Sequence, residues 1–151
     1  MNNFIPILSS YGSIIDCNKN KIWTPEDISK KVLSTVNELI ALGFENGDNV
    51  FIKHSELPDF FSQLIAIWSL GGSVSCLNPD ITDEELKNLM SFMSPNFLVD
   101  KNKVNIISGS KNPKENKDNF KLYSFADKPA LILFTSGTTG VPKAVVHSFR
   151  S

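Results

Sequence analysis

Apolar residues recur along this chain with two different periods, and each period predicts a different kind of element. Between residues 28 and 40 they are spaced by three or four positions, which is typical of a helix with one buried face. Between residues 49 and 54 they alternate as in a strand. From residue 58 to residue 70 the chain is apolar nearly all round, so this segment is predicted to be a buried helix.

Capping and breaking residues predict where three helices begin and end. A threonine precedes the first and the third helix, and in the third it forms a capping box with a glutamate three residues later. Glycine ends the first two helices and proline stops the third. These signals are, in chain order, Thr24, Pro25, Gly43, Gly71, Gly72, Thr82, Glu85 and Pro95.

Short apolar runs between turn residues predict the strands and, with the helices, the fold class. The predicted strands are a hairpin of 14–16 and 21–23, followed by 49–54, 73–77, 97–99, 104–107, 130–134 and 144–147. Strands alternating with helices argue for βαβ units, and hence for an α/β fold with a parallel-rich sheet flanked by helices. The polar stretch 111–119 is predicted to be a solvated loop.

Composition and charge exclude several classes of function but say little about the fold. The chain has 151 residues and a net charge of -1, so no general attraction to nucleic acid or to an anionic membrane is expected. Arg150 is its only arginine, which excludes an arginine cluster as a phosphate site. No apolar run is long enough to span a bilayer, and two isolated cysteines suggest a reducing compartment, so the predicted location is cytoplasmic.

The stretch with the clearest chemistry is Phe134–Lys143, read as FTSGTTGVPK. Two glycines allow a sharp turn that exposes backbone N–H groups, and four hydroxyl side chains add donors for an anion. Lys143 supplies a positive charge at the end of the turn. The segment is not a Walker A loop, because proline rather than glycine precedes the lysine. A surface turn without function is the competing interpretation, but the combination favours a phosphate-binding loop.

This loop resembles the signature loop of the adenylate-forming superfamily. That superfamily includes acyl-CoA synthetases, 4-coumarate–CoA ligases, beetle luciferases and peptide-synthetase adenylation domains. Four further segments resemble the same family in the same order along the chain, so the resemblance covers nearly all of it. They are 23–27 (WTPED), 42–50 (LGFENGDNV), 66–79 (AIWSLGGSVSCLNP) and 81–89 (ITDEELKNL).

The resemblance implies the fold, the reaction and the site residues. Residues 1–151 are expected to be an incomplete AMP-binding N-terminal domain, a partial N-terminal subdomain of the ligase fold that ends just after the phosphate loop. Family members activate a carboxylic acid with ATP and Mg²⁺, forming an acyl-adenylate that a thiol such as coenzyme A then accepts. The residues expected to bind ATP are Thr135, Ser136, Gly137, Thr138, Thr139 and Lys143. No catalytic residue and no metal ligand is assigned.

The sequence departs from the family pattern at two positions near the loop. Ala144 stands where the family usually has glycine, and Phe149 stands where histidine is frequent. Regions that hold the acid, the adenine and the catalytic lysine lie further along in relatives, so this chain alone is not expected to catalyse the reaction. A C-terminal peroxisomal signal on a longer parent is left open.

Two interpretations of the chain remain. It is part of an acid–CoA ligase, which is preferred over a luciferase or a peptide-synthetase domain, or it is a ligase-derived binding or interaction module without catalysis. In either case the apolar strand at residues 144–146 is predicted to be an exposed sheet edge that favours self-association.

Overall fold

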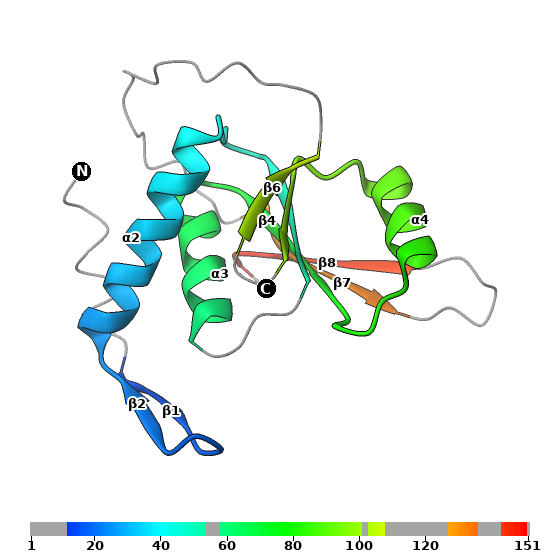
Figure 1. The fold of residues 1–151 in the computed structure, drawn as a ribbon. Helices are drawn as coiled ribbons and strands as arrows, with labels where there is room; N and C mark the ends of the chain where they lie inside the picture. The colour runs from blue at the N-terminus through cyan, green and yellow to red at the C-terminus, as the bar shows by residue number, and fades with distance from the viewer. Residues whose placement is uncertain (1–11, 54–57, 101–102, 108–126, 136–142, 151) are drawn as a thin grey trace.

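The computed structural model describes residues 12–53, 58–100, 103–107, 127–135 and 143–150, and the predicted loop at 111–119 lies outside them. A two-stranded hairpin stands apart from a six-stranded sheet, as Figure 1 shows. The predicted α/β fold with flanking helices is confirmed. The elements are β1 (Ile14–Asp16), β2 (Lys21–Trp23), α2 (Pro25–Ala41), β3 (Asn49–Lys53), α3 (Asp59–Ser69), β4 (Ser73–Leu77), α4 (Asp83–Met93), β5 (Phe97–Asp100), β6 (Lys103–Ile106), β7 (Pro129–Thr135) and β8 (Lys143–Ser148).

The helix ends are formed by the local signals that the sequence predicted. Thr24 caps α2 and Thr82 caps α4, and each side chain accepts a hydrogen bond from the backbone of the third helical residue. Both caps are capping boxes, although in α2 the returning carboxylate comes from an aspartate, Asp27. Gly43, with φ of 82°, follows the end of α2, in the left-handed region that glycine adopts without steric cost.

The six-stranded sheet is mixed, with the order β6-β5-β3-β4-β7-β8. The four central strands run parallel to one another, as the alternating pattern predicted. Both outer strands are antiparallel to their neighbours: β6 pairs with β5, and β8 pairs with β7. Each outer strand therefore forms an antiparallel pair at one edge of the sheet. Helix α3 connects the parallel strands β3 and β4, and helix α4 connects β4 and β5.

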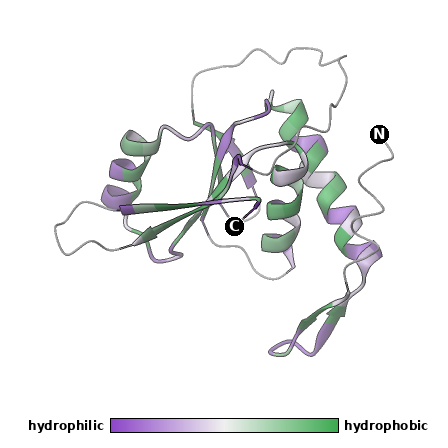
Figure 2. Ribbon diagram, turned by 180° about the vertical axis from the view of Figure 1, so that it is seen from behind, coloured by the Kyte–Doolittle hydropathy of each residue, from purple (hydrophilic) through white to green (hydrophobic). Residues whose placement is uncertain are grey.

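Helices cover both faces of the parallel centre (Figure 1). On one face, Leu39 of α2 and Ile67 of α3 are fully buried against Val50 and Val74 of the sheet. On the other face, Leu89 of α4 packs in a second core. Figure 2 shows the apolar character of α3, which lies between α2 and the sheet and is buried on most of its surface.

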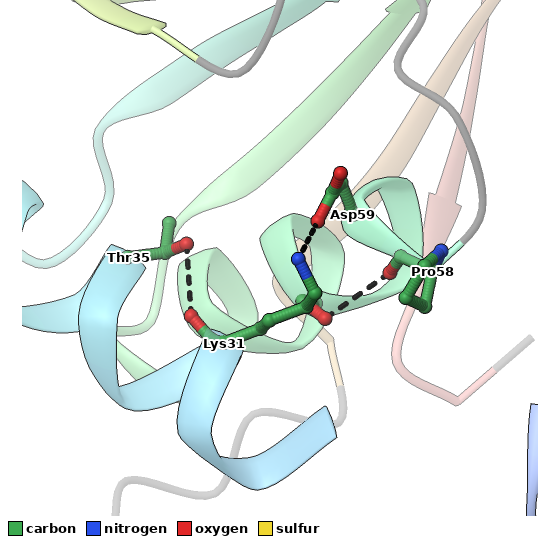
Figure 3. A network of polar contacts seen from close by, with 5 residues as sticks. Lys31, Thr35, Pro58 and Asp59 are labelled. Atoms are coloured by element: carbon green, nitrogen blue, oxygen red, sulfur yellow. Dashed lines mark hydrogen bonds and ion pairs between the residues drawn. The ribbon is translucent and has the colours of Figure 1, made fainter. Parts of the chain in front are cut away.

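A polar contact joins the two helices on the first face (Figure 3). The ammonium of Lys31 on α2 donates to the carboxylate of Asp59, the first residue of α3, and both side chains are partly exposed. The backbone oxygen of Lys31 in turn accepts from the hydroxyl of Thr35 at 3.1 Å. Since Asp59 lies in the first turn of α3, its negative charge also interacts favourably with the positive N-terminal end of the helix dipole.

Candidate phosphate-binding site

The carboxyl ends of the parallel strands form the edge of the sheet at which the candidate site lies. After β3 the chain enters α3 on one face, and after the adjacent β4 it enters α4 on the opposite face. Chain segments that leave neighbouring strands in opposite directions open a crevice, and α/β proteins commonly bind ligands there. The strand beside β4 is β7, which runs parallel to it and ends at Thr135.

Thr135 and Lys143 lie side by side at this edge. They are cross-strand partners where β7 and β8 meet, and the Thr135 hydroxyl donates to the backbone oxygen of Lys143 at 3.4 Å. Both residues are exposed. The two residues that flank segment 136–142 in the sequence therefore meet at the carboxyl end of β7, next to β4.

Of the six residues predicted to bind ATP, the structure therefore places two, at the base of the loop. Ser136, Gly137, Thr138 and Thr139 lie outside the described residues, so their contribution stays a prediction. The register also brings two charged residues to the same edge that the sequence did not suggest. Lys53 ends β3 beside Asp100 of β5, two strands away from Thr135. No local pattern marks them, because only the sheet order brings them near β7.

The two departures from the family pattern have structural settings. Ala144 is half-buried and faces Phe134 across the β7–β8 pair. Phe149 lies just beyond the opposite end of β8, where its ring contacts Trp68 edge to face with centroids 5.8 Å apart. Since Phe149 lies six residues beyond Lys143, it is roughly 20 Å along the strand from the loop.

A hollow among the described residues lies at this far end of β8. Its volume is about 380 Å³, and it is lined mainly by apolar atoms of Trp68, Leu131 and Phe149, with His147 and Ser148 on β8. The Trp68 indole N–H donates to the backbone oxygen of Ala130 at 2.8 Å, which joins α3 to β7. The hollow is thus separated from Thr135 by most of the length of β7.

Other reactive side chains add nothing to the candidate site. Burial raises the pKa of the Cys76 thiol to about 11, so little of it is thiolate at neutral pH. Cys17 is exposed on the hairpin, and neither cysteine forms a disulfide. Within the described ranges, no group of three or more His, Cys, Asp or Glu residues could hold a metal ion. None of the described helices is long and apolar enough to cross a bilayer.

A mixed sheet with a parallel centre and helices on both faces defines an α/β protein, and in the sequence a Ser/Thr/Gly-rich segment follows the carboxyl end of β7. The family model for AMP-binding enzymes matches residues 11–151, and the chain belongs to this family. Its fold matches the N-terminal subdomain of adenylate-forming enzymes.

Known relatives are distant in sequence and much longer. The chain is 28% identical over 144 residues to the hybrid PKS-NRPS synthetase xenE of Xenoacremonium sinensis, covering 87% of this chain and 4% of that protein. It is 27% identical over 146 residues to the 2-succinylbenzoate–CoA ligase of Bacillus pumilus, covering 87% and 29%. The chain therefore spans less than a third of the length of these curated relatives.

A solved structure shows the same fold. It is the N-terminal subdomain of Klebsiella oxytoca NpsA in complex with 3-hydroxyanthranilyl-AMSN. The TM-score is 0.70 at 22% identity, with 95% of this chain and 39% of that chain covered.

Proposed function

We propose that this chain is the part of an adenylate-forming ligase that holds the ATP phosphates while a carboxylic acid is activated. The observation that carries the proposal is the pairing of Thr135 with Lys143, which anchors the Ser/Thr/Gly-rich segment at the carboxyl end of a parallel strand. The proposed phosphate ligands are backbone N–H groups and hydroxyls of this segment and the ammonium group of Lys143. Membership in the AMP-binding family supports the same assignment.

In the proposed reaction the acid's carboxylate attacks the α-phosphorus of ATP, and pyrophosphate leaves as the acyl-adenylate forms. Thr135, Ser136, Gly137, Thr138 and Thr139 hold oxygens of the β- and γ-phosphates, and Lys143 neutralises charge that grows on the leaving pyrophosphate. Fixed donors act here without reorganising during the reaction, which is why they lower the barrier.

Magnesium is proposed to enter this site with ATP and to lie beside the hydroxyls of the loop. The described residues offer no carboxylate cluster for it, whereas the hydroxyls of a Ser/Thr-rich loop are suitable oxygen ligands beside phosphate. When bound, Mg²⁺ would neutralise phosphate charge. The role of this chain's own residues is to fix the direction in which the triphosphate lies.

The thiol acceptor is proposed to be coenzyme A, by similarity to the 2-succinylbenzoate–CoA ligase. A carrier-bound thiol is the alternative, because multidomain synthetases are similar to the same residues. The chain spans less than a third of its curated relatives, so we propose that these 151 residues alone do not complete the reaction. This leaves a ligase-derived binding module as the second candidate.

The remaining proposals concern location and association. The protein is proposed to act in the cytoplasm, in agreement with its unpaired cysteines. The exposed edge predicted at residues 144–146 is proposed to support self-association of the chain.

Titration calorimetry with Mg–ATP tests the phosphate assignment. Lys143→Ala should weaken ATP binding by roughly tenfold or more, because a charge-assisted contact is lost. Lys103→Ala is the matched control, since Lys103 is also an exposed strand residue but lies at the other edge of the sheet, on β6. Equal affinities for the two variants would contradict the proposed role of Lys143. Pyrophosphate release, measured in parallel with aliphatic and aromatic acids, should be absent if these 151 residues alone do not complete the reaction.

A further inference from the structure

A pair of phenylalanine rings links the parallel centre of the sheet to the base of the candidate loop. Phe51 is the middle residue of β3 and is fully buried. Its ring meets the ring of Phe134 edge to face, with centroids 6.0 Å apart and planes at 72° to each other. Phe134 directly precedes Thr135, the last residue of β7. A side chain in the core thus contacts the neighbour of a predicted ATP-binding residue.

The strand order brings these two rings together. Strand β4 lies between β3 and β7, so the backbones that carry the rings are roughly 10 Å apart. The register sets Phe51 beside Ser75 of β4. Ser75 in turn pairs with Ile132, which lies on β7 two residues before Phe134. The Ser75 side chain is small and fully buried, which leaves space over β4 for the two rings to meet.

Phe51 is held in place by the core beneath α4. It belongs to this core together with Leu77 of β4 and Leu89 of α4, and Phe134 packs against the same core. Phe51 has no exposed surface, whereas Phe134 is half-buried. Protein interiors are close-packed, so a ring that is enclosed on all sides has little freedom to move. Phe51 is therefore the fixed member of the pair, and Phe134 is the member that it orients.

Phe134 in turn sets the geometry of the last residues of the β7–β8 pair. It is the cross-strand partner of Ala144, and the next pair along the strands is Thr135 with Lys143. Neighbouring residues of a strand point to opposite faces, so the Phe134 ring lies on one face and the Thr135 and Lys143 side chains lie on the other. A change of backbone tilt at Phe134 would therefore move Thr135 and Lys143 together.

We propose that Phe51 is a positioning residue for the phosphate site, and that it acts through Phe134 to hold Thr135 and Lys143 in the geometry that receives the phosphates of ATP. The inference rests on the proposed function and adds to it a residue outside segment 134–143. Groups that are already in place bind more tightly, because a mobile group loses conformational freedom on binding. Loss of the ring contact should therefore weaken ATP binding in a chain that is still folded.

Titration calorimetry with Mg–ATP on Phe51→Leu tests the inference, with Phe97→Leu as the matched control. Phe97 is also a buried phenylalanine on a parallel strand, but it stacks on Phe44 in the core of the opposite face. Phe51→Leu should weaken ATP binding at least about threefold, whereas Phe97→Leu should change it less than about twofold. Thermal unfolding by circular dichroism should show a similar loss of stability in both variants, because the two substitutions remove the same ring from a core.

The half-buried partner supplies a second test that leaves the fully buried residue unchanged. Phe134→Leu removes the same ring contact and should weaken ATP binding by a similar factor, whereas Phe134→Tyr keeps the ring and should bind as the parent does. In the Phe134→Leu background, Phe51→Leu should weaken binding by less than about a further twofold, because both changes break one contact. Fully additive effects would exclude a route through Phe134.

The outcomes separate this inference from the proposed function. ATP binding by the parent, with a selective loss in Phe51→Leu, supports both. If the parent binds ATP and Phe51→Leu and Phe97→Leu bind it equally well, the positioning role is overturned and the phosphate site remains. A folded parent that does not bind Mg–ATP would overturn the proposed function, and the positioning role with it. Should Phe51→Leu fail to fold, the comparison of Phe134→Leu with Phe134→Tyr decides.

Discussion

Replacing Gly72 with alanine tests the closest backbone approach in the turn between α3 and β4. A Cβ atom at this position would lie 2.5 Å from Cζ of Phe44, 2.9 Å from the backbone oxygen of Asp48 and 2.9 Å from Cγ2 of Ile67. Neither of the first two atoms moves away easily. The Asp48 oxygen accepts a hydrogen bond of 2.9 Å from the first residue of β4, and the Phe44 ring stacks on Phe97 with centroids 5.5 Å apart.

The expected loss of stability follows from these contacts. Overpacking a well-packed core generally costs about 1–3 kcal/mol, and the fixed neighbours place Gly72→Ala near the upper end, at about 3 kcal/mol. For a chain of 151 residues, a change of about 1 kcal/mol moves the melting temperature by about 2–4 °C, so Gly72→Ala should melt roughly 6–12 °C lower.

Thermal unfolding followed by circular dichroism measures this shift. Gly12→Ala is the matched control, because Gly12 is exposed and a Cβ atom there meets nothing within 4 Å. The control should melt within about 1–2 °C of the parent, as surface substitutions usually do. If Gly72→Ala melted at the control's temperature, the tight packing of this turn against the loop before β3 would be refuted.

The other stability and reactivity predictions concern a helix cap and the cysteines. Thr82→Ala should lower the melting temperature by roughly 2–4 °C near neutral pH, because the N-cap of α4 is lost. Hydrogen bonds from the Thr82 backbone and hydroxyl lower the pKa of Glu85 below its usual 4.5, so this part of the stability is present above that pH and is lost as the pH falls through the folded-state pKa. The difference in melting temperature between parent and variant should therefore shrink on acidification, and a constant difference would contradict the assignment. Cys17 should react with a disulfide reagent at pH 7.5 long before the half-buried Cys76, whose thiol has a pKa raised to about 11 by partial burial. Similar rates in the folded protein would argue against this difference in exposure and pKa.

Local chemistry explains why much of the fold could be predicted from the sequence. The caps at Thr24 and Thr82 and the glycine after α2 depend on hydrogen bonds or backbone angles within four residues. Even so, the box in α2 was not predicted, since its third residue is Asp27 and not the usual glutamate or glutamine. The alternation of strands and helices likewise predicted the parallel centre of the sheet.

The candidate site was predictable only in part. The residue types and spacing of segment 134–143 predicted a phosphate-binding loop, and the family match supports that interpretation. Sequence alone could not show that Thr135 and Lys143 pair at the carboxyl edge, since the pairing depends on β8 turning back beside β7. It could not place Lys53 and Asp100 at the same edge, because they come from strands that are separated by α3, β4 and α4.

The sequence by itself determined most of the elements and their ends and indicated the family, because each rests on residues a few positions apart, whereas the phosphate-binding role of the loop stays a prediction. Only the tertiary structure decided the strand order and the antiparallel edges. These depend on contacts between distant residues, such as the hydrogen bond from Trp68 to Ala130, 62 residues apart in the chain. The free energy of such contacts comes from packing and sheet pairing in three dimensions, which leaves no local pattern in the sequence to mark the partner.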